Sequence, residues 1–302
     1  MMTDDFFFEY IRNLVRLHEL IAQGQGDSAE ADAVRDQMDW PWSQLNRPQI
    51  ELADGLSSDL YTLGTNRAAT GLEHTSVDEF SEAVRRQDWV GALKLIRRHE
   101  SSLTPASAAF LRGVCWAHLK QPEIAIKFFE ESSRIEPPDS ERVIWHLSCL
   151  IQSGRAMEAV PNARELLRTS SDLMLRRVAL EVLFAAASHL PDAERRAMLP
   201  DACQIAESLL SDERWRTQPD RADAQLALWL HLAISYLDLD DDQKSKHACL
   251  QALQIRPDNR SALELLGFLN YEDFPQAERR HFVHRYQQES IRVFSQAPLT
   301  IA

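Results

Sequence analysis

The chain has little cysteine and no excess of basic residues. Its four cysteines, Cys115, Cys149, Cys203 and Cys249, lie far apart and show no Cys-x-x-Cys spacing. Each falls inside a pattern typical of a helix, so we predict reduced, buried thiols in place of disulfides or a metal site. A formal net charge of −13 excludes broad nucleic-acid binding, because such binding neutralises phosphates with Lys and Arg.

Long hydrophobic runs are also absent. The most apolar stretch, VALEVLFAAASHL, contains Glu181. It falls short of the roughly 18 to 20 uninterrupted apolar residues that a membrane-spanning helix needs. The start of the chain, MMTDDFFFEYIRN, is acidic where a secretory signal is basic. We therefore expect a cytoplasmic protein that does not enter a membrane.

A repeat of 34 residues runs through much of the chain, in segments that begin at residues 106, 140, 226 and 260. A fixed period of this length is typical of stacked supersecondary units. With the first residue of each segment as place 1, small side chains recur at places 8 and 20. There they would let two antiparallel helices approach to the usual 8–10 Å. The residues that we expect to pack the repeats are Gly113, Trp116, Ala125, Phe129, Pro137, Ala159, Trp229, Ala233, Tyr236, Ala252, Pro257 and Gly267.

These residues resemble the tetratricopeptide repeat (TPR) family over about residues 77–293. Segments 106–139 and 226–259 match well, the segments beginning at 140 and 260 match less well, and residues 77–105 match only loosely. The resemblance implies an all-α fold: a right-handed TPR superhelix of about five to six helix-turn-helix units, followed by a tail at 294–302. The alternative is an irregular helical bundle with accidental periodicity.

The repeat frame breaks once, between residues 174 and 226, where 52 residues take the place of 34. We expect an elongated fourth unit with an insertion near 191–219. The insertion should form an extra turn or loop near Pro191–Pro200 and a linker at 214–220. Such an insertion is either a tolerated surface loop or part of a binding face.

Residues 1–64 should form an acidic helical hairpin with a short third helix, joined to the repeats by a linker at 65–76. Residues 1–70 contain twelve acidic residues against five arginines. Apolar spacing predicts a helix over 4–22 that Gly24 and Gly26 end. Asp27 and Glu30 suggest a capping box for a second helix, which Pro41 would end, and Pro48 favours the start of a third.

A second resemblance concerns about residues 14–63. The stretches LIAQGQGDSAEADAVRDQMDWPW and GLSSDLYTL are similar to the opening segment of uncharacterised bacterial TPR-containing proteins. This resemblance implies a bacterial cytosol and an association with TPR units, and it carries no known activity.

No motif predicts a catalytic residue, a metal ligand or a cofactor. The aspartates of DLDDDQ at 238–243 lack the central Gly and the twelfth-place Glu of a calcium loop, which favours a solvated turn. Glu278, His281 and His284 lack the second Glu-x-x-His pair of a di-iron bundle. We interpret that segment as an amphipathic terminal helix with Phe282 and Tyr286 facing inward.

The first helix of each TPR unit lines a concave face, and its apolar positions predict a partner-binding groove. Proteins of the family that bind charged chaperone C-termini carry Lys, Arg and Asn there, and this chain does not. A hydrophobic peptide or an amphipathic helix could bind in the groove, or the chain's own Phe6–Phe8 and Trp40–Trp42 could cover it. A third interpretation is that the repeat register is misplaced. The expected groove residues are Phe110, Val114, Ile144, Ile151, Leu230, Ile234, Leu237, Phe268 and Tyr271.

Taken together, these patterns predict a non-catalytic scaffold or adaptor for protein–protein interaction through an apolar concave groove. One alternative is an enzyme, or an enzyme's regulatory subunit, with a site near residues 191–219 and the His-rich terminal helix. Another is a self-assembling structural protein. The expected partner is an apolar or amphipathic protein or peptide, with no nucleic acid and no membrane, and the sequence leaves the oligomeric state open.

Overall fold

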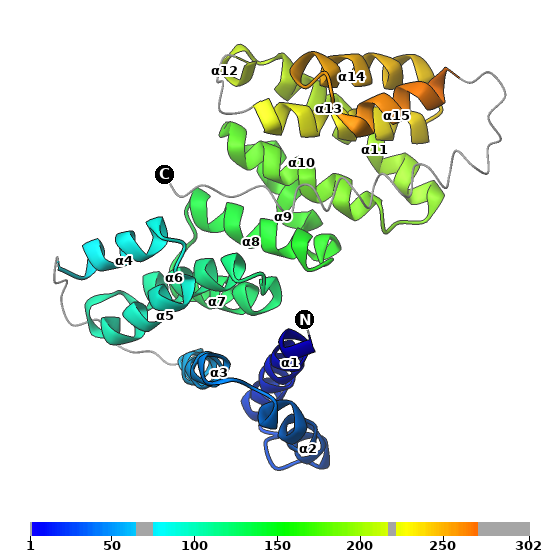
Figure 1. The fold of residues 1–302 in the computed structure, drawn as a ribbon. Helices are drawn as coiled ribbons and strands as arrows, with labels where there is room; N and C mark the ends of the chain where they lie inside the picture. Colours follow the sequence, from blue (N-terminus) through cyan, green and yellow to red (C-terminus); the bar gives the residue numbers. More distant parts are fainter. Residues whose placement is uncertain (1, 65–74, 217–221, 271–302) are drawn as a thin grey trace. The chain divides into compact units, whose positions relative to one another are not determined.

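The chain forms an all-α fold in which helices follow one another as antiparallel pairs (Figure 1). The structure, a computed structural model, describes residues 2–64, 75–216 and 222–270, and these contain no β-strand. The helices group into two compact units, a first of residues 1–138 and a second of residues 139–302. The first unit holds α1 (Met2–Ala22), α2 (Ala29–Ser43), α3 (Arg47–Leu60), α4 (Thr75–Arg85), α5 (Trp89–Arg98), α6 (Pro105–His118) and α7 (Pro122–Ile135). The second unit holds α8 (Ser140–Gln152), α9 (Ala156–Thr169), α10 (Leu173–Ala187), α11 (Asp192–Ser211), α12 (Glu213–Arg216), α13 (Ala222–Asp238), α14 (Asp242–Ile255) and α15 (Arg260–Leu269).

One type of tight turn closes five of the described hairpins. In each turn one residue adopts the left-handed conformation. The N–H of the residue that follows it donates a hydrogen bond of 2.8–2.9 Å to the carbonyl of the residue five positions earlier in the chain. This hydrogen bond ends the first helix of the pair. Lys120 and Gly154 occupy the same place in successive repeats. Gly24 forms the same type of turn between α1 and α2. The sequence did not show that this N-terminal hairpin shares its turn with the repeats. The left-handed residues of these five turns are Gly24, Gln87, Lys120, Gly154 and Asp240.

Close packing of α6 on α7 depends on a glycine. A Cβ built on Gly113 would lie 2.5 Å from Cε1 of Phe129, so only a hydrogen atom fits between the two helices. Trp116 and Ala125 are completely buried beside this contact. The Ser132 hydroxyl donates a hydrogen bond of 2.9 Å to the Ala106 carbonyl at the far end of the pair. These residues therefore hold α6 and α7 together along their length.

The α13–α14 pair of the second unit is packed as closely as α6–α7. Ala233 and Ser245 are completely buried, and the Ser245 hydroxyl donates a 2.7 Å hydrogen bond to the Ala233 carbonyl. The short side chain at place 20 thus also satisfies a backbone group of the facing helix. Of the other expected packing residues, Ala159, Tyr236 and Ala252 are buried, Trp229 is half-buried, Gly267 is exposed, and Pro137 and Pro257 lie exposed in the connections between hairpins.

The α8–α9 pair is packed less closely than the other two. Leu147 stands at place 8, where Gly113 and Ala233 stand in the closely packed pairs. Place 24, which Phe129 fills in α7, holds the smaller Ala163 in α9. Instead, α9 lies chiefly along α10, whose Ala179 and Ala186 are completely buried. In the second unit the close partner of α9 is therefore the helix that follows it.

The break in the repeat frame is absorbed mainly by a long helix. The expected loop between Pro191 and Pro200 is wrong, because α11 continues without interruption from Asp192 to Ser211. Pro191 precedes this helix, while Pro200 lies within it and is exposed. The short α12 follows, and its Trp215 is completely buried. The expected linker lies partly outside the described residues, at 217–221.

The N-terminal helices differ from their sequence-based boundaries at two points. The cap of α2 is Ser28, one residue beyond the expected Asp27, and its side chain accepts from the Ala31 N–H. Pro41 does not end α2, which continues through this buried proline to Ser43. Near the end of a helix, a proline removes only one of the last backbone hydrogen bonds. The expected third helix is α3, with Pro48 in its first turn and a capping box between Asn46 and Gln49.

A buried ionic cluster fixes the N-terminal helices to the first repeat hairpins within the first unit. Asp59 of α3 is buried and accepts hydrogen bonds from Arg97 of α5, at 3.0 Å from both Nε and Nη2. It also accepts from Nε of Arg112 of α6, at 2.9 Å. Gly55, one turn earlier on α3, leaves the space that the Arg97 guanidinium occupies. The predicted hairpin segment is thus packed on α5 and α6 and forms one compact unit with them.

Candidate protein-interaction site

The structure places the nine expected groove residues in three groups. Phe110 of α6, Ile144 of α8 and Leu230 of α13 are half-buried and keep some accessible surface. Tyr271 lies outside the described residues. The remaining five are buried, so their side chains pack within the protein and offer a partner little area. These five are Val114, Ile151, Ile234, Leu237 and Phe268.

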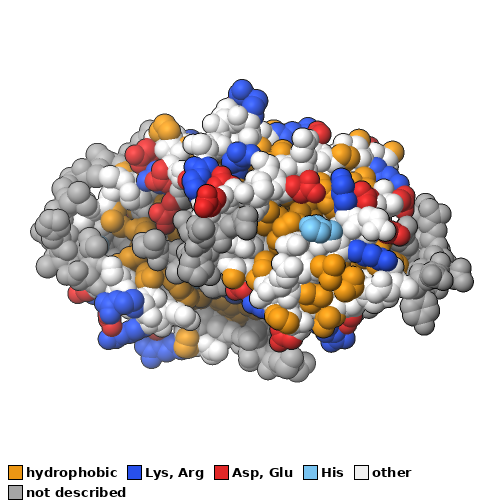
Figure 2. Space-filling model, turned by 90° about the horizontal axis from the view of Figure 1, so that it is seen from above, with side chains coloured by type: hydrophobic (Ala, Val, Ile, Leu, Met, Phe, Trp, Pro, Cys, Tyr) orange, Lys and Arg blue, Asp and Glu red, His pale blue; other side chains and the backbone are white. Residues whose placement is uncertain are grey.

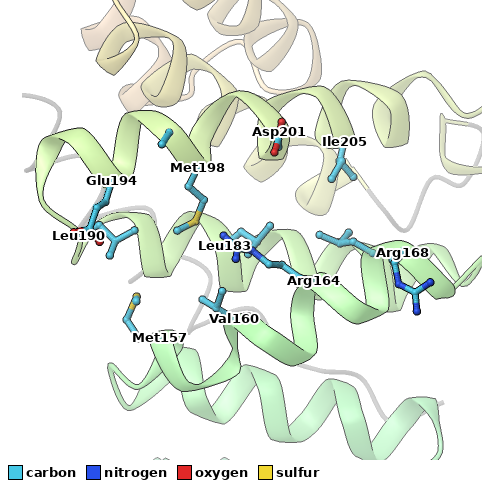
Figure 3. A pocket seen from close by; sticks show the side chains of 12 residues that line it. Met157, Val160, Arg164, Arg168, Leu183, Leu190, Glu194, Met198, Asp201 and Ile205 are labelled. Atoms are coloured by element: carbon cyan, nitrogen blue, oxygen red, sulfur yellow. The ribbon is translucent and has the colours of Figure 1, made fainter.

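A hollow is present elsewhere, on the second helices of two successive hairpins in the second unit. It has a volume of about 630 Å³ and lies between α9 and α11, with α10 beneath (Figure 3). Figure 3 shows Met157 and Val160 of α9 facing Met198 of α11 across it. Met157 is 43% exposed, and Ala197 of α11 is exposed as well. The lining residues are Met157, Val160, Arg164, Leu167, Arg168, Leu183, Leu190, Glu194, Ala197, Met198, Asp201 and Ile205.

Charges of opposite sign line the two walls of the hollow. The α9 wall carries Arg164 and Arg168, and the α11 wall carries Glu194 and Asp201. Arg168 is paired with Glu165 on its own helix, at 2.7 Å. Within the described parts of the second unit, no ion pair joins the two walls across the hollow. The site therefore combines an apolar floor with a cationic edge and an anionic edge.

Helix composition explains why a hollow forms at this place. The α9 helix packs less closely on α8 than on the alanine-rich α10. The α11 helix is longer than the other second helices of the described hairpins and extends past the end of α10. Methionines, whose flexible thioether side chains adapt to irregular partners, stand on both walls. The sequence signal for the site was the break in the repeat frame at residues 174–226.

The aspartate run at 238–243 has structural roles that its sequence pattern did not predict. Asp238 is buried and accepts a 2.6 Å hydrogen bond from Nε of Arg195 on α11. Asp240 is the left-handed residue of the turn and pairs with Arg196, while Asp241 caps α14. The run thus joins α13 to α11 through two arginines, and Asp238 is not the solvated residue that we expected.

The four cysteines are free and buried. Burial raises the pKa of each thiol to about 12, so the thiolate that reacts with electrophiles or binds metals is scarce at neutral pH. No group of three or more His, Cys, Asp or Glu side chains capable of holding a metal ion occurs within residues 2–64, 75–216 and 222–270. Glu278, His281 and His284, with Phe282 and Tyr286, lie outside these ranges.

Hydrophobic side chains elsewhere on the surface are interspersed with charged ones. Figure 2 shows one face of the molecule, on which apolar areas alternate with Lys, Arg, Asp and Glu. The largest exposed apolar side chain of the described residues is Trp40 of α2, at 65% exposure. Of the helices that the structure describes, none combines the length and the hydropathy needed to cross a bilayer.

Comparison with known proteins gives a weak structural similarity. No family model matches the chain, and no curated protein does. Among solved structures, the TPR domain of P58(IPK) is similar at 17% sequence identity, with 95% of this chain and 80% of that chain covered and a TM-score of 0.31. At that score the similarity carries no argument about function. The all-α, TPR-like character of the chain rests on its own repeated hairpins.

Proposed function

We propose that this chain is a non-catalytic scaffold or adaptor that binds another protein. The observation that carries the proposal is the hollow between α9 and α11, where apolar side chains remain accessible although α9 is closely packed on α10. Accessible apolar area rimmed by charged residues is typical of a protein-binding surface. Phe110, Ile144 and Leu230 on the first helices add smaller accessible areas.

A rigid frame supports this function. The left-handed turns, the Gly113–Phe129 contact and the cluster around Asp59 fix the helices within each unit. A partner then meets a surface that is already in place, which lowers the entropic cost of binding. The N-terminal helices belong to this frame in the first unit, which argues against a movable lid formed by residues 1–64. Buried thiols and the resemblance of residues 14–63 support a bacterial cytoplasmic protein.

Affinity capture tests the proposal. The immobilised full chain is exposed to a lysate of the source organism, and captured proteins are identified by mass spectrometry. Each candidate is then purified and mixed with the chain, and the mass of the complex is measured by light scattering after size exclusion. We expect a complex of fixed stoichiometry with at least one partner. A chain that only associates with itself, at every concentration, would contradict the proposal.

A further inference from the structure

We infer that the hollow between α9 and α11 binds an amphipathic α-helix of the partner protein. The bound helix presents an apolar stripe to the floor, acidic residues to the α9 wall and basic residues to the α11 wall. This inference rests on the proposed function, because its occupant is a segment of the partner.

The backbone around the hollow favours a helix over an extended peptide. Apart from Leu190 in the α10–α11 connection, the lining residues lie on helices. The backbone groups of these helices are bonded within each helix, except where Pro161 of α9 and Pro200 of α11 each lack an N–H. An extended peptide buried there would find no strand edge for its own backbone groups, and unsatisfied groups of this kind are costly. A helix satisfies its backbone hydrogen bonds internally and has only side chains to place.

The floor suits the apolar stripe of such a helix. Val160, Leu183 and Met198 come from three different helices and surround one space of about 630 Å³. That volume lies within the roughly 300–1,000 Å³ of typical ligand sites, and it opens to solvent along Met157. A few large side chains at i, i+3, i+4 and i+7 can enter it, while the rest of the bound helix stays above the surface.

The spacing of the charges also fits a helix laid along the groove. Arg164 and Arg168 are one helical turn apart on α9, about 6 Å. Glu194 and Asp201 are two turns apart on α11, about 10 Å. Arg164, Glu194 and Asp201 are exposed, and no described ion pair uses them. Charged side chains on the two edges of a bound helix repeat at the same intervals, so each wall can pair with an edge of opposite sign.

Three synthetic peptides of about 18 residues serve as probes, all with the same leucine stripe at helical spacing. One carries Glu along one edge and Lys along the other, the second carries Glu on both edges and the third carries Lys on both. Binding to the full chain is measured by fluorescence anisotropy at low salt. We expect the mixed peptide to bind one-to-one, and each uniform peptide to bind about two- to fivefold more weakly, the scale of exposed ion pairs.

Two protein variants test the floor. Ala197→Trp fills the hollow from the exposed side of α11, and Ala193→Trp adds the same bulk one turn earlier, at an exposed position that does not line it. We expect Ala197→Trp to lower the affinity for the mixed peptide by about tenfold or more. Ala193→Trp should leave the affinity for this peptide within about twofold of that of the unaltered chain. Circular dichroism checks that both variants stay folded. Equal binding to the two variants would overturn the inference.

Charge variants test the walls. Arg164→Glu with Arg168→Glu makes both walls anionic and should shift the preference to the peptide with Lys on both edges. Glu194→Lys with Asp201→Lys makes both walls cationic and should shift it to the peptide with Glu on both edges. A preference that does not follow the walls, or binding to anionic lipid vesicles with none to any peptide, overturns the inference. If a captured native partner binds the Ala197→Trp variant with the same affinity as the unaltered chain, the assignment of the hollow as its binding site is wrong, although the scaffold function stands.

Discussion

Gly113 of α6 and Phe129 of α7 are in direct contact, with the phenyl ring where a Cβ on the glycine would be. The two residues stand at places 8 and 24 of one repeat, so the contact explains an offset that is visible in the sequence alone. At the corresponding position of α8 the side chain is Leu147, and α8 and α9 are packed less closely. A glycine at place 8 thus stands in a closely packed pair, and a leucine at the same place stands in a less closely packed one.

Gly113→Ala should destabilise the protein although alanine is the better helix former. The added methyl group would force the buried Phe129 ring or the two helices apart, at a cost of about 1–3 kcal/mol for an overpacked core. Gly267→Ala is the matched control, because a Cβ added to this glycine of α15 would have no atom within 4 Å. There, removing a helix glycine should stabilise by about 0.5–1 kcal/mol. Urea unfolding followed by circular dichroism measures both, and a stabilising Gly113→Ala would contradict the packing.

Substitutions at the left-handed residues of two hairpin turns should change the free energy of unfolding in opposite directions. Lys120 and Gly154 adopt the left-handed conformation at the same place of successive repeats, with φ of 62° and 75°. A side chain in this conformation costs about 1–2 kcal/mol. Lys120→Gly should therefore raise the free energy of unfolding. Part of this gain is lost because glycine increases the entropy of the unfolded chain. Gly154→Ala should lower the free energy of unfolding by about 1 kcal/mol. Thermal unfolding of both variants shows whether each substitution stabilises or destabilises the protein. A change in the same direction for both would contradict the claim that the two turns have the same conformation.

Asp59→Asn should strongly destabilise the protein, because it leaves the guanidinium groups of Arg97 and Arg112 without their buried carboxylate. Removing one partner of a buried ionic cluster costs about 3–5 kcal/mol. Asp54→Asn, at an exposed position on the same helix, should cost less than about 0.5 kcal/mol. Hydrogen exchange measured by mass spectrometry should show faster exchange in α3, α5 and α6 for Asp59→Asn only. Unchanged protection in α3 would mean that the cluster does not hold the N-terminal helices.

His231 predicts a loss of stability in acid. Burial beside Phe184, with ring centroids 4.9 Å apart, lowers the pKa of His231 to about 4. Between the unfolded pKa of about 6.5 and this folded value, the unfolded chain binds the extra proton. The contribution of His231 is therefore present at neutral pH and is lost as the pH falls from about 6.5 to 4, by up to roughly 3 kcal/mol.

His231→Phe isolates this effect, since the other titrating groups are the same in both proteins. The free energy of unfolding of the variant, relative to that of the unaltered chain, should increase steadily between pH 7 and pH 4.5. Any constant cost of the substitution cancels in this comparison. A difference that does not change with pH would show that His231 titrates normally in the folded state.

Much of the helix pattern could be predicted from the sequence because it depends on local chemistry. Gly24 ends α1, Pro48 lies in the first turn of α3, and the 34-residue offsets mark the hairpins of both units. Local rules failed at Pro41 and Pro200, where the helices continue. A proline removes one backbone hydrogen bond, and packing of the rest of the helix can outweigh that loss.

The candidate site was predictable only in part. The frame break pointed to residues 174–226, and α11 does line the hollow. The expected groove residues were assigned from repeat positions alone, and five of them are buried. Helical periodicity shows which residues share a face, whereas it does not show whether a neighbouring helix covers that face.

By itself, the sequence determined that the chain is helical, that its helices pair, and where small side chains let them approach, because these properties follow from residue size and local backbone preference. Tertiary structure alone decided that Asp59 meets Arg97 and Arg112, that α9 lies along α10, and that a hollow remains between α9 and α11. These relationships join residues far apart in the chain. They depend on how well whole helix surfaces fit together, and no local pattern records that fit.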